Sequence, residues 1–200
     1  MQNIKYSLNQ PVTDAFNSLG QSTHLQTLTL IRCALYAIIA IVLTSGASAW
    51  ANFQGEVVRV LDGDTIDVLV NRRTIRVRLI DIDAPESGQA FSQRAHQRLA
   101  ALTYRQIVEI AKKETDQYGR ILGTVYVNLS YSSNVTQRTN INAVMVEEGM
   151  AWAYRYDGKP VNLQMYALEK KARSQRRGLW SDSNAQEPWK WRRKSKINSN

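Results

Sequence analysis

The residues whose types could do chemistry lie in one short stretch, residues 62–86, which reads DGDTIDVLVNRRTIRVRLIDIDAPE. Carboxylates stand at both of its ends, as Asp62, Asp64, Asp81, Asp83 and Glu86. Carboxylates brought together repel one another unless a cation or arginines neutralise them, and oxygen-only ligands suit a hard ion such as Ca²⁺ or Mg²⁺. Arg78 adds a planar, permanently charged group that matches a phosphate. The stretch therefore predicts a metal site beside a phosphate-binding arginine.

Two runs of alternating apolar residues separate these carboxylates. Residues 66–70 and 75–79 each follow a period of two, which is typical of half-buried strands, and residues 71–73 would form the turn between them. The two ends of an antiparallel hairpin lie side by side, so the carboxylates of both ends are expected to meet. Strict alternation would send Arg78 and Asp83 to opposite faces. A bulge or strand end near Asp81 is therefore expected if both serve one site.

The rest of the domain is predicted to add three strands and three helices. The further strands are expected at Phe53 to Leu61, Gln106 to Lys112 and Tyr118 to Val127. The helices are expected at residues 89–103, at residues 142–149, and between Pro160 at a first helical position and a closing Gly178. Asn128 to Asn140 is rich in Asn, Ser and Thr and predicts a surface loop.

Histidine chemistry is nearly excluded, because His96 is the only histidine after residue 49. A single histidine cannot build a multi-histidine metal site, and a carboxylate must then supply any general base. His96 lies beside the apolar stripe of its predicted helix and is expected to face solvent.

With these residues in view, the chain resembles the staphylococcal nuclease family. The resemblance rests on the joint spacing of Asp64, Arg78, Asp83, Glu86 and Arg120, and it continues through Tyr118-Gly119-Arg120 to about Trp180. It implies an α+β, mainly β fold, a five-stranded OB-type barrel with three helices. It also implies calcium-dependent hydrolysis of phosphodiester bonds in DNA and RNA, with products that end in a 3′-phosphate.

The resemblance also implies a role for each site residue. The implied Ca²⁺ ligands are Asp64, Asp83 and the main-chain carbonyl of Ala84. The implied catalytic residues are Glu86 as general base and Arg78 and Arg120 as phosphate-binding groups. The implied residues of the nucleotide pocket are Tyr118 and Tyr154. Asp62, Asp67 and Asp81 are expected to be turn or surface acids.

The first 49 residues predict an N-terminal extension and a signal peptide. An apolar run at residues 33–43 follows Arg32, and Ala47-Ser-Ala49 then provides a cleavage pattern. We therefore expect cleavage after Ala49 and export, to a secreted or periplasmic location. The alternative is an uncleaved membrane anchor, for which the run is short.

The net charge of +9 favours a polyanionic partner, which could be nucleic acid or an anionic membrane surface. Residues 50–181 are expected to form the nuclease-like domain, and residues 182–200 a basic tail. Two tryptophans in the tail, Trp189 and Trp191, could stack on unpaired bases or pack on the domain. We expect a monomer acting on DNA and RNA, with unpaired regions favoured and no obligate protein partner. A non-catalytic, nucleic-acid-binding module of the same fold is the alternative.

Overall fold

The computed structural model describes residues 52–132 and 135–198. The predicted hairpin forms from β2 (Thr65–Val70) and β3 (Arg73–Leu79), which pair in antiparallel fashion. Asn71 and Arg72 make the two-residue turn, with φ of 48° and 66°. Positive φ at both positions is what a tight hairpin turn requires. The alternating apolar residues are buried in the middle of the hairpin and toward its open end, as the period of two predicted, and half-buried next to the turn, at Val70 and Ile75.

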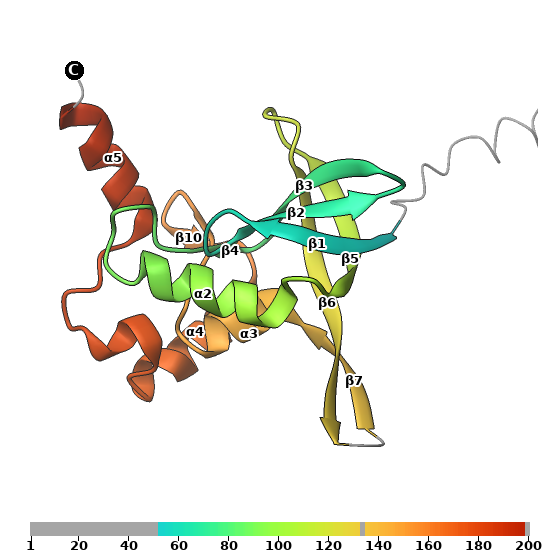
Figure 1. Cartoon of the computed structure of the whole chain (residues 1–200). Helices are drawn as coiled ribbons and strands as arrows, with labels where there is room; N and C mark the ends of the chain where they lie inside the picture. The colour runs from blue at the N-terminus through green and yellow to red at the C-terminus, as the bar shows by residue number, and fades with distance from the viewer. Residues whose placement is uncertain (1–51, 133–134, 199–200) are drawn as a thin grey trace, which may run out of the picture. The chain divides into compact units, whose positions relative to one another are not determined.

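Five strands close into a barrel, which confirms the predicted five-stranded barrel (Figure 1). β1 (Phe53–Val60) pairs with β2 on one side and with β5 (Ile107–Thr115) on the other, and β6 (Ile121–Ser132) pairs with β5. A short parallel pairing between β3 and β6 completes the circle. Closure removes exposed strand edges and encloses a core of branched apolar side chains.

The predicted loop at residues 128–140 is wrong. β6 continues to Ser132, and β7 (Val135–Asn140) pairs with it as an antiparallel hairpin. Polar composition suggested a loop, but cross-strand contacts stabilise the hairpin instead. Arg138 of β7 lies 3.3 Å from the centroid of the Tyr126 ring and donates to both carboxylate oxygens of Glu109 on β5.

Two helices cover the barrel where the sequence predicted them. α2 (Ser92–Thr103) buries Ala95 and Leu99 against the core, and α3 (Ile141–Glu147) buries Met145. The side chain of Asn140 accepts a hydrogen bond from the main-chain N–H of Ala143 and so caps the start of α3.

The predicted boundaries of the next helix are wrong at both ends. Pro160 lies in β10 (Lys159–Pro160), which pairs with β9 (Arg155–Tyr156). α4 (Leu163–Ser174) starts later, because Asn162 caps it by accepting from the N–H groups of residues 164 and 165. Gly178 does not close α4 but opens the short 3₁₀ helix η1 (Gly178–Ser181).

Within residues 52–132 and 135–198, a fourth α-helix corrects the total of three predicted for the domain. α5 (Pro188–Asn198) forms inside the stretch predicted to be a basic tail, and Pro188 stands at its first position, where a missing N–H costs nothing. A small two-stranded pairing, β4 (Ile82–Asp83) with β8 (Trp152–Ala153), holds the chain just after the barrel hairpin.

The predicted signal peptide and its cleavage after Ala49 lie outside the described residues. In the part of the chain that the structure describes, no helix has the length and apolar character needed to cross a membrane.

Candidate active site

A cleft of about 770 Å³ opens where β2 begins and β3 ends. Its walls come from the barrel hairpin, the turn before β6, the segment after β8, and α5. All but one of the predicted site residues line it, namely Asp64, Arg78, Ala84, Glu86, Tyr118, Arg120 and Tyr154. Asp83 is the exception, because its side chain is fully buried beside the cleft.

Arg78 joins the two buried carboxylates. Its Nη1 lies 2.5 Å from Oδ1 of Asp64, and its Nη2 lies 3.0 Å from Oδ1 of Asp83. The irregularity that this geometry needs is present, since Asp81 has a φ of 65° between β3 and β4 and turns the chain back. The turn brings both carboxylates to one guanidinium despite the alternation of the strand.

The segment around Asp64 comes very close to the one around Asp83. The main-chain N–H of Ala84 donates to Oδ2 of Asp64 over 2.9 Å. A Cβ placed on Gly63 would lie 2.7 Å from the Cβ of both Ala84 and Ala95, so a residue with a side chain does not fit here without movement. Glycine at position 63 therefore permits the approach of the two acidic segments.

Burial dominates the electrostatics of Asp64. Loss of water raises the pKa of the Asp64 carboxyl to about 7, although the nearby Arg78 acts in the opposite direction. The positive charge of Arg78 therefore does not fully stabilise the ionised Asp64 carboxylate, and a bound cation would add the stabilisation that is missing.

The donors fit a hard cation in type. Asp64 and Asp83 would offer carboxylate oxygens and Ala84 a main-chain carbonyl, and such ions complete their shell with water. Within residues 52–132 and 135–198, no group of three or more His, Cys, Asp or Glu side chains could hold a metal ion. The protein would therefore supply only part of the shell.

Arg192, which α5 carries into the site, was not among the predicted site residues. Its Nη1 and Nη2 lie 3.0 Å and 2.9 Å from Oδ1 and Oδ2 of Asp83, and its Nη1 also donates to Oε1 of Glu86. The tail gave one usable signal, since Pro188 followed by good helix-forming residues indicates a helix start. Nothing in the spacing indicated which carboxylates Arg192 would reach.

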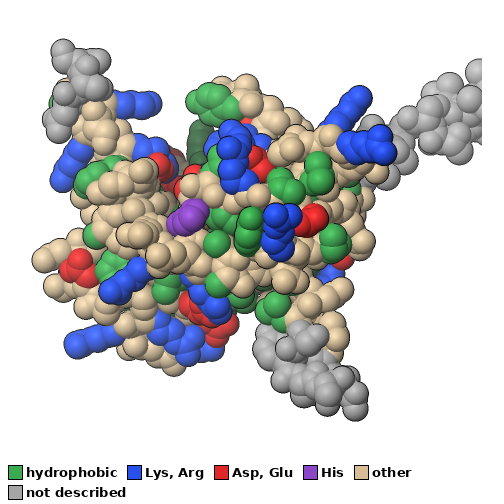
Figure 2. Space-filling model, viewed as in Figure 1, with side chains coloured by type: hydrophobic (Ala, Val, Ile, Leu, Met, Phe, Trp, Pro, Cys, Tyr) green, Lys and Arg blue, Asp and Glu red, His purple; other side chains and the backbone are tan. Residues whose placement is uncertain are grey.

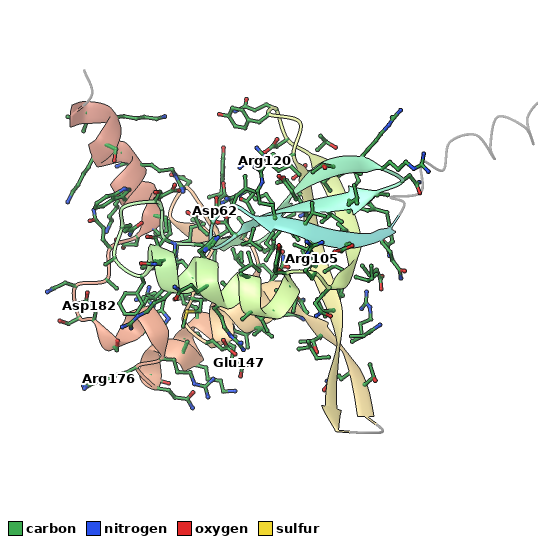
Figure 3. All side chains as sticks on the ribbon, viewed as in Figure 1. Asp62, Arg105, Arg120, Glu147, Arg176 and Asp182 are labelled. Atoms are coloured by element: carbon green, nitrogen blue, oxygen red, sulfur yellow. The ribbon has the colours of Figure 1, made fainter. Side chains whose placement is uncertain are left out.

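Arg120 stands on another wall of the cleft, at the end of a turn that includes Gly119 with a φ of 79°. Oδ2 of Asp116 accepts from its Nε over 2.7 Å, and its guanidinium lies 5.5 Å from the centroid of the Tyr118 ring. Tyr118 is 74% exposed, and Tyr154 is partly exposed across the cleft. Figure 3 labels Arg120 and Asp62, which line the same cleft.

Two of the three acids expected at turns or on the surface fit that expectation. Oδ1 of Asp62 accepts from the N–H of Asp64, and Oδ2 of Asp81 accepts from Asn162. Asp67 does not fit, because it is buried in β2.

Two arginines hold the Asp67 carboxylate. Nη2 of Arg59 lies 2.6 Å from Oδ2 of Asp67, and Nε of Arg76 lies 2.8 Å from Oδ1.

His96 also differs from its prediction, since it is half-buried and its Nε2 lies 3.2 Å from the carbonyl oxygen of Val60.

Asp67→Asn is expected to lower the free energy of unfolding by about 1–2 kcal/mol at neutral pH, because two partly exposed arginines lose a charged acceptor. The hydrogen bond from Arg76, with that from Arg59, holds the pKa of Asp67 below its usual range against the effect of burial. The contribution is therefore present above the unfolded-state pKa of about 4 and is lost as the pH falls through the lower folded-state pKa. Urea unfolding should show a difference between wild type and variant that shrinks from neutral pH toward about pH 3. An equal difference at both pH values would contradict this assignment.

The fold and the cleft together define a class of protein, a closed OB-type barrel that presents carboxylates and arginines to an anionic ligand. A sequence model described as "Staphylococcal nuclease homologue" matches residues 76–182, which is more than half of the chain. The chain belongs to the staphylococcal nuclease family, as the resemblance in its sequence indicated.

Relatives across most of the chain agree with this assignment. "Micrococcal nuclease" of Shigella flexneri is 68% identical over 168 residues, covering 84% of this chain and 97% of the relative. "Protein ParB" of Escherichia coli is 56% identical over 154 residues, covering 77% of this chain and 87% of the relative. An "Uncharacterized endonuclease" of Haemophilus influenzae is 43% identical over 144 residues, covering 71% of this chain and 74% of the relative.

Proposed function

We propose that this protein is an exported, Ca²⁺-dependent nuclease that hydrolyses phosphodiester bonds in DNA and RNA and leaves 3′-phosphate ends. The observation that carries the proposal is the meeting of Asp64, Arg78 and Asp83 at a cleft that Glu86 and Arg120 also line. Membership of the staphylococcal nuclease family supports it. Export is proposed from the apolar run and cleavage pattern of residues 33–49.

The chemistry requires groups of these types. A phosphodiester is already anionic, so a nucleophile is repelled until positive groups stabilise the phosphoryl oxygens, and Arg78 and Arg120 offer such groups from two walls of the cleft. Glu86 takes the proton of the attacking water as general base. Asp64, Asp83 and the carbonyl of Ala84 would hold the cation, which supplies further stabilisation of negative charge on the phosphate when bound.

The exposed tyrosines suit a substrate with accessible bases. Tyr118 and Tyr154 border the cleft with exposed rings, and base–aromatic stacking tolerates any base because every base has a π-face. We therefore expect unpaired regions of DNA and RNA to be preferred. Duplexes would first have to lose the stacking of their own bases.

Removal of the cation tests this function. Digestion of single-stranded DNA and of RNA by the full chain in Ca²⁺ at roughly millimolar concentration, a level suited to weak extracellular sites, should stop in excess chelator and return when Ca²⁺ is restored. Without the cation, the two buried carboxylates add negative charge near the position of the phosphate. Fragment release on a gel provides the measurement. Cleavage that continues undiminished in chelator would defeat the cation-dependent mechanism.

A further inference from the structure

The ion pair between α5 and the acidic segments is unlike an ordinary surface pair. Asp83 is fully buried, yet Arg192 contacts both of its carboxylate oxygens and Oε1 of Glu86 as well. Arg192 thus binds two of the groups on which the proposed function depends, one a cation ligand and the other the general base.

The first turn of α5 is anchored to the domain, which places Arg192 over the site. Pro188 is buried, and the Trp189 ring lies 5.4 Å from the guanidinium carbon of Arg155 in the neighbouring β9. The side chain of Gln89 donates to the carbonyl of Gln186, just before the helix. Figure 1 shows α5, in red, standing beside the β9–β10 hairpin. The tail tryptophan Trp189 therefore contacts the domain.

Beyond this anchored turn, the helix turns charged residues outward. Arg193 and Lys194 are exposed, and Figure 2 shows lysine and arginine side chains projecting from this part of the molecule. A buried proline, a cation–π contact and a hydrogen bond hold the start of α5, whereas the charge pair of Arg192 binds its middle to the site.

Arg192 and a divalent cation would use the same oxygens. The Arg192 guanidinium donates to both oxygens of Asp83, and Arg78 already donates to one of them, so a divalent cation would be a third positive group on one carboxylate. In this arrangement Arg192 occupies the carboxylate oxygens that a cation would need.

We propose that α5 is an autoinhibitory latch, in which Arg192 holds Asp83 and Glu86 in the place of the divalent cation and is displaced when the cation binds. The proposal rests on the proposed function, because it takes Asp83 as a cation ligand. The apparent affinity for the cation is then reduced by the fraction of molecules in which the latch is closed.

Direct cation binding tests the latch without reference to catalysis. Calcium is titrated calorimetrically into the full chain as wild type, as Arg192→Gln and as Arg193→Gln, the last being the matched control one position along the same helix. Arg192→Gln is expected to bind Ca²⁺ roughly five- to tenfold more tightly, as for a latch that is open in about one molecule in five to ten. Arg193→Gln should match wild type. Equal affinities of wild type and Arg192→Gln, or no binding by either, would overturn the latch.

Hydrogen–deuterium exchange of residues 188–198 supplies a second readout. Calcium should speed exchange in wild type, since α5 loses the contact made by Arg192, whereas Arg192→Gln should exchange fast with or without calcium. Unchanged exchange in wild type would contradict displacement. If Arg192→Gln proves poorly folded, Arg192→Lys keeps a positive charge but loses the two-point contact, and it should bind calcium more tightly than wild type. Equal affinities of Arg192→Lys and wild type would then overturn the latch.

The failure of the latch and of the proposed function can be told apart. If the protein cleaves nucleic acid but wild type and Arg192→Gln bind calcium equally tightly, the proposed nuclease function stands and the latch is wrong. If Arg192→Gln binds calcium more tightly than wild type but none of the proteins cleaves nucleic acid, the latch stands and the proposed nuclease function is wrong.

Discussion

Glu86→Gln is expected to lower the rate of phosphodiester hydrolysis by roughly 10²–10⁴-fold, with nucleic-acid binding nearly unchanged. The amide has almost the same size as the carboxylate but cannot take a proton from the attacking water. Glu86 lines the cleft and accepts a hydrogen bond from Arg192, while Arg192 keeps two contacts to Asp83. The substitution should therefore leave the arrangement of the site largely intact.

The measurement compares initial cleavage rates of single-stranded DNA and RNA with their binding in chelator. Glu147→Gln is the matched control, because Glu147 lies on α3 outside the cleft, where it pairs with Lys171 (Figure 3). The control should cleave at the wild-type rate. Undiminished cleavage by Glu86→Gln would show that Glu86 is not the general base. A wild-type protein that binds nucleic acid but does not cleave it would favour the non-catalytic binding module.

Arg120→Lys is expected to reduce the cleavage rate by about 10²–10³-fold, although the positive charge is kept. Asp116 accepts from Nε of Arg120, which leaves the two terminal nitrogens for two parallel hydrogen bonds to a phosphate. Lysine offers only a point charge on a flexible chain and loses this fork. The loss should fall mainly on the maximal rate, since the donors are most effective on the charge that develops in the transition state.

Arg105→Lys is the matched control for that substitution. Arg105 pairs with Glu56 on the exposed surface and does not line the cleft (Figure 3). Its replacement by lysine should leave the rate unchanged. A rate for Arg120→Lys equal to that of this control would show that Arg120 is only a surface cation.

The amino-acid sequence by itself determined the barrel strands and the chemical content of the cleft. The alternation around residues 66–70 and 75–79 is a local property, because side chains on a strand alternate between core and solvent whatever the rest of the chain does. The types and spacing of Asp64, Arg78 and Asp83 indicated the family without any coordinates.

The positions of the charges relative to one another were decided only by the tertiary structure. The reversal at Asp81 brings Asp83 back to Arg78, and the burial of Asp67 between two arginines depends on how β2 sits in the closed barrel. Arg192 meets Asp83 across 109 positions of sequence through the docking of α5, which no local pattern encodes. Periodicity reports short-range geometry, whereas the partner of a buried charge depends on which distant elements pack beside it.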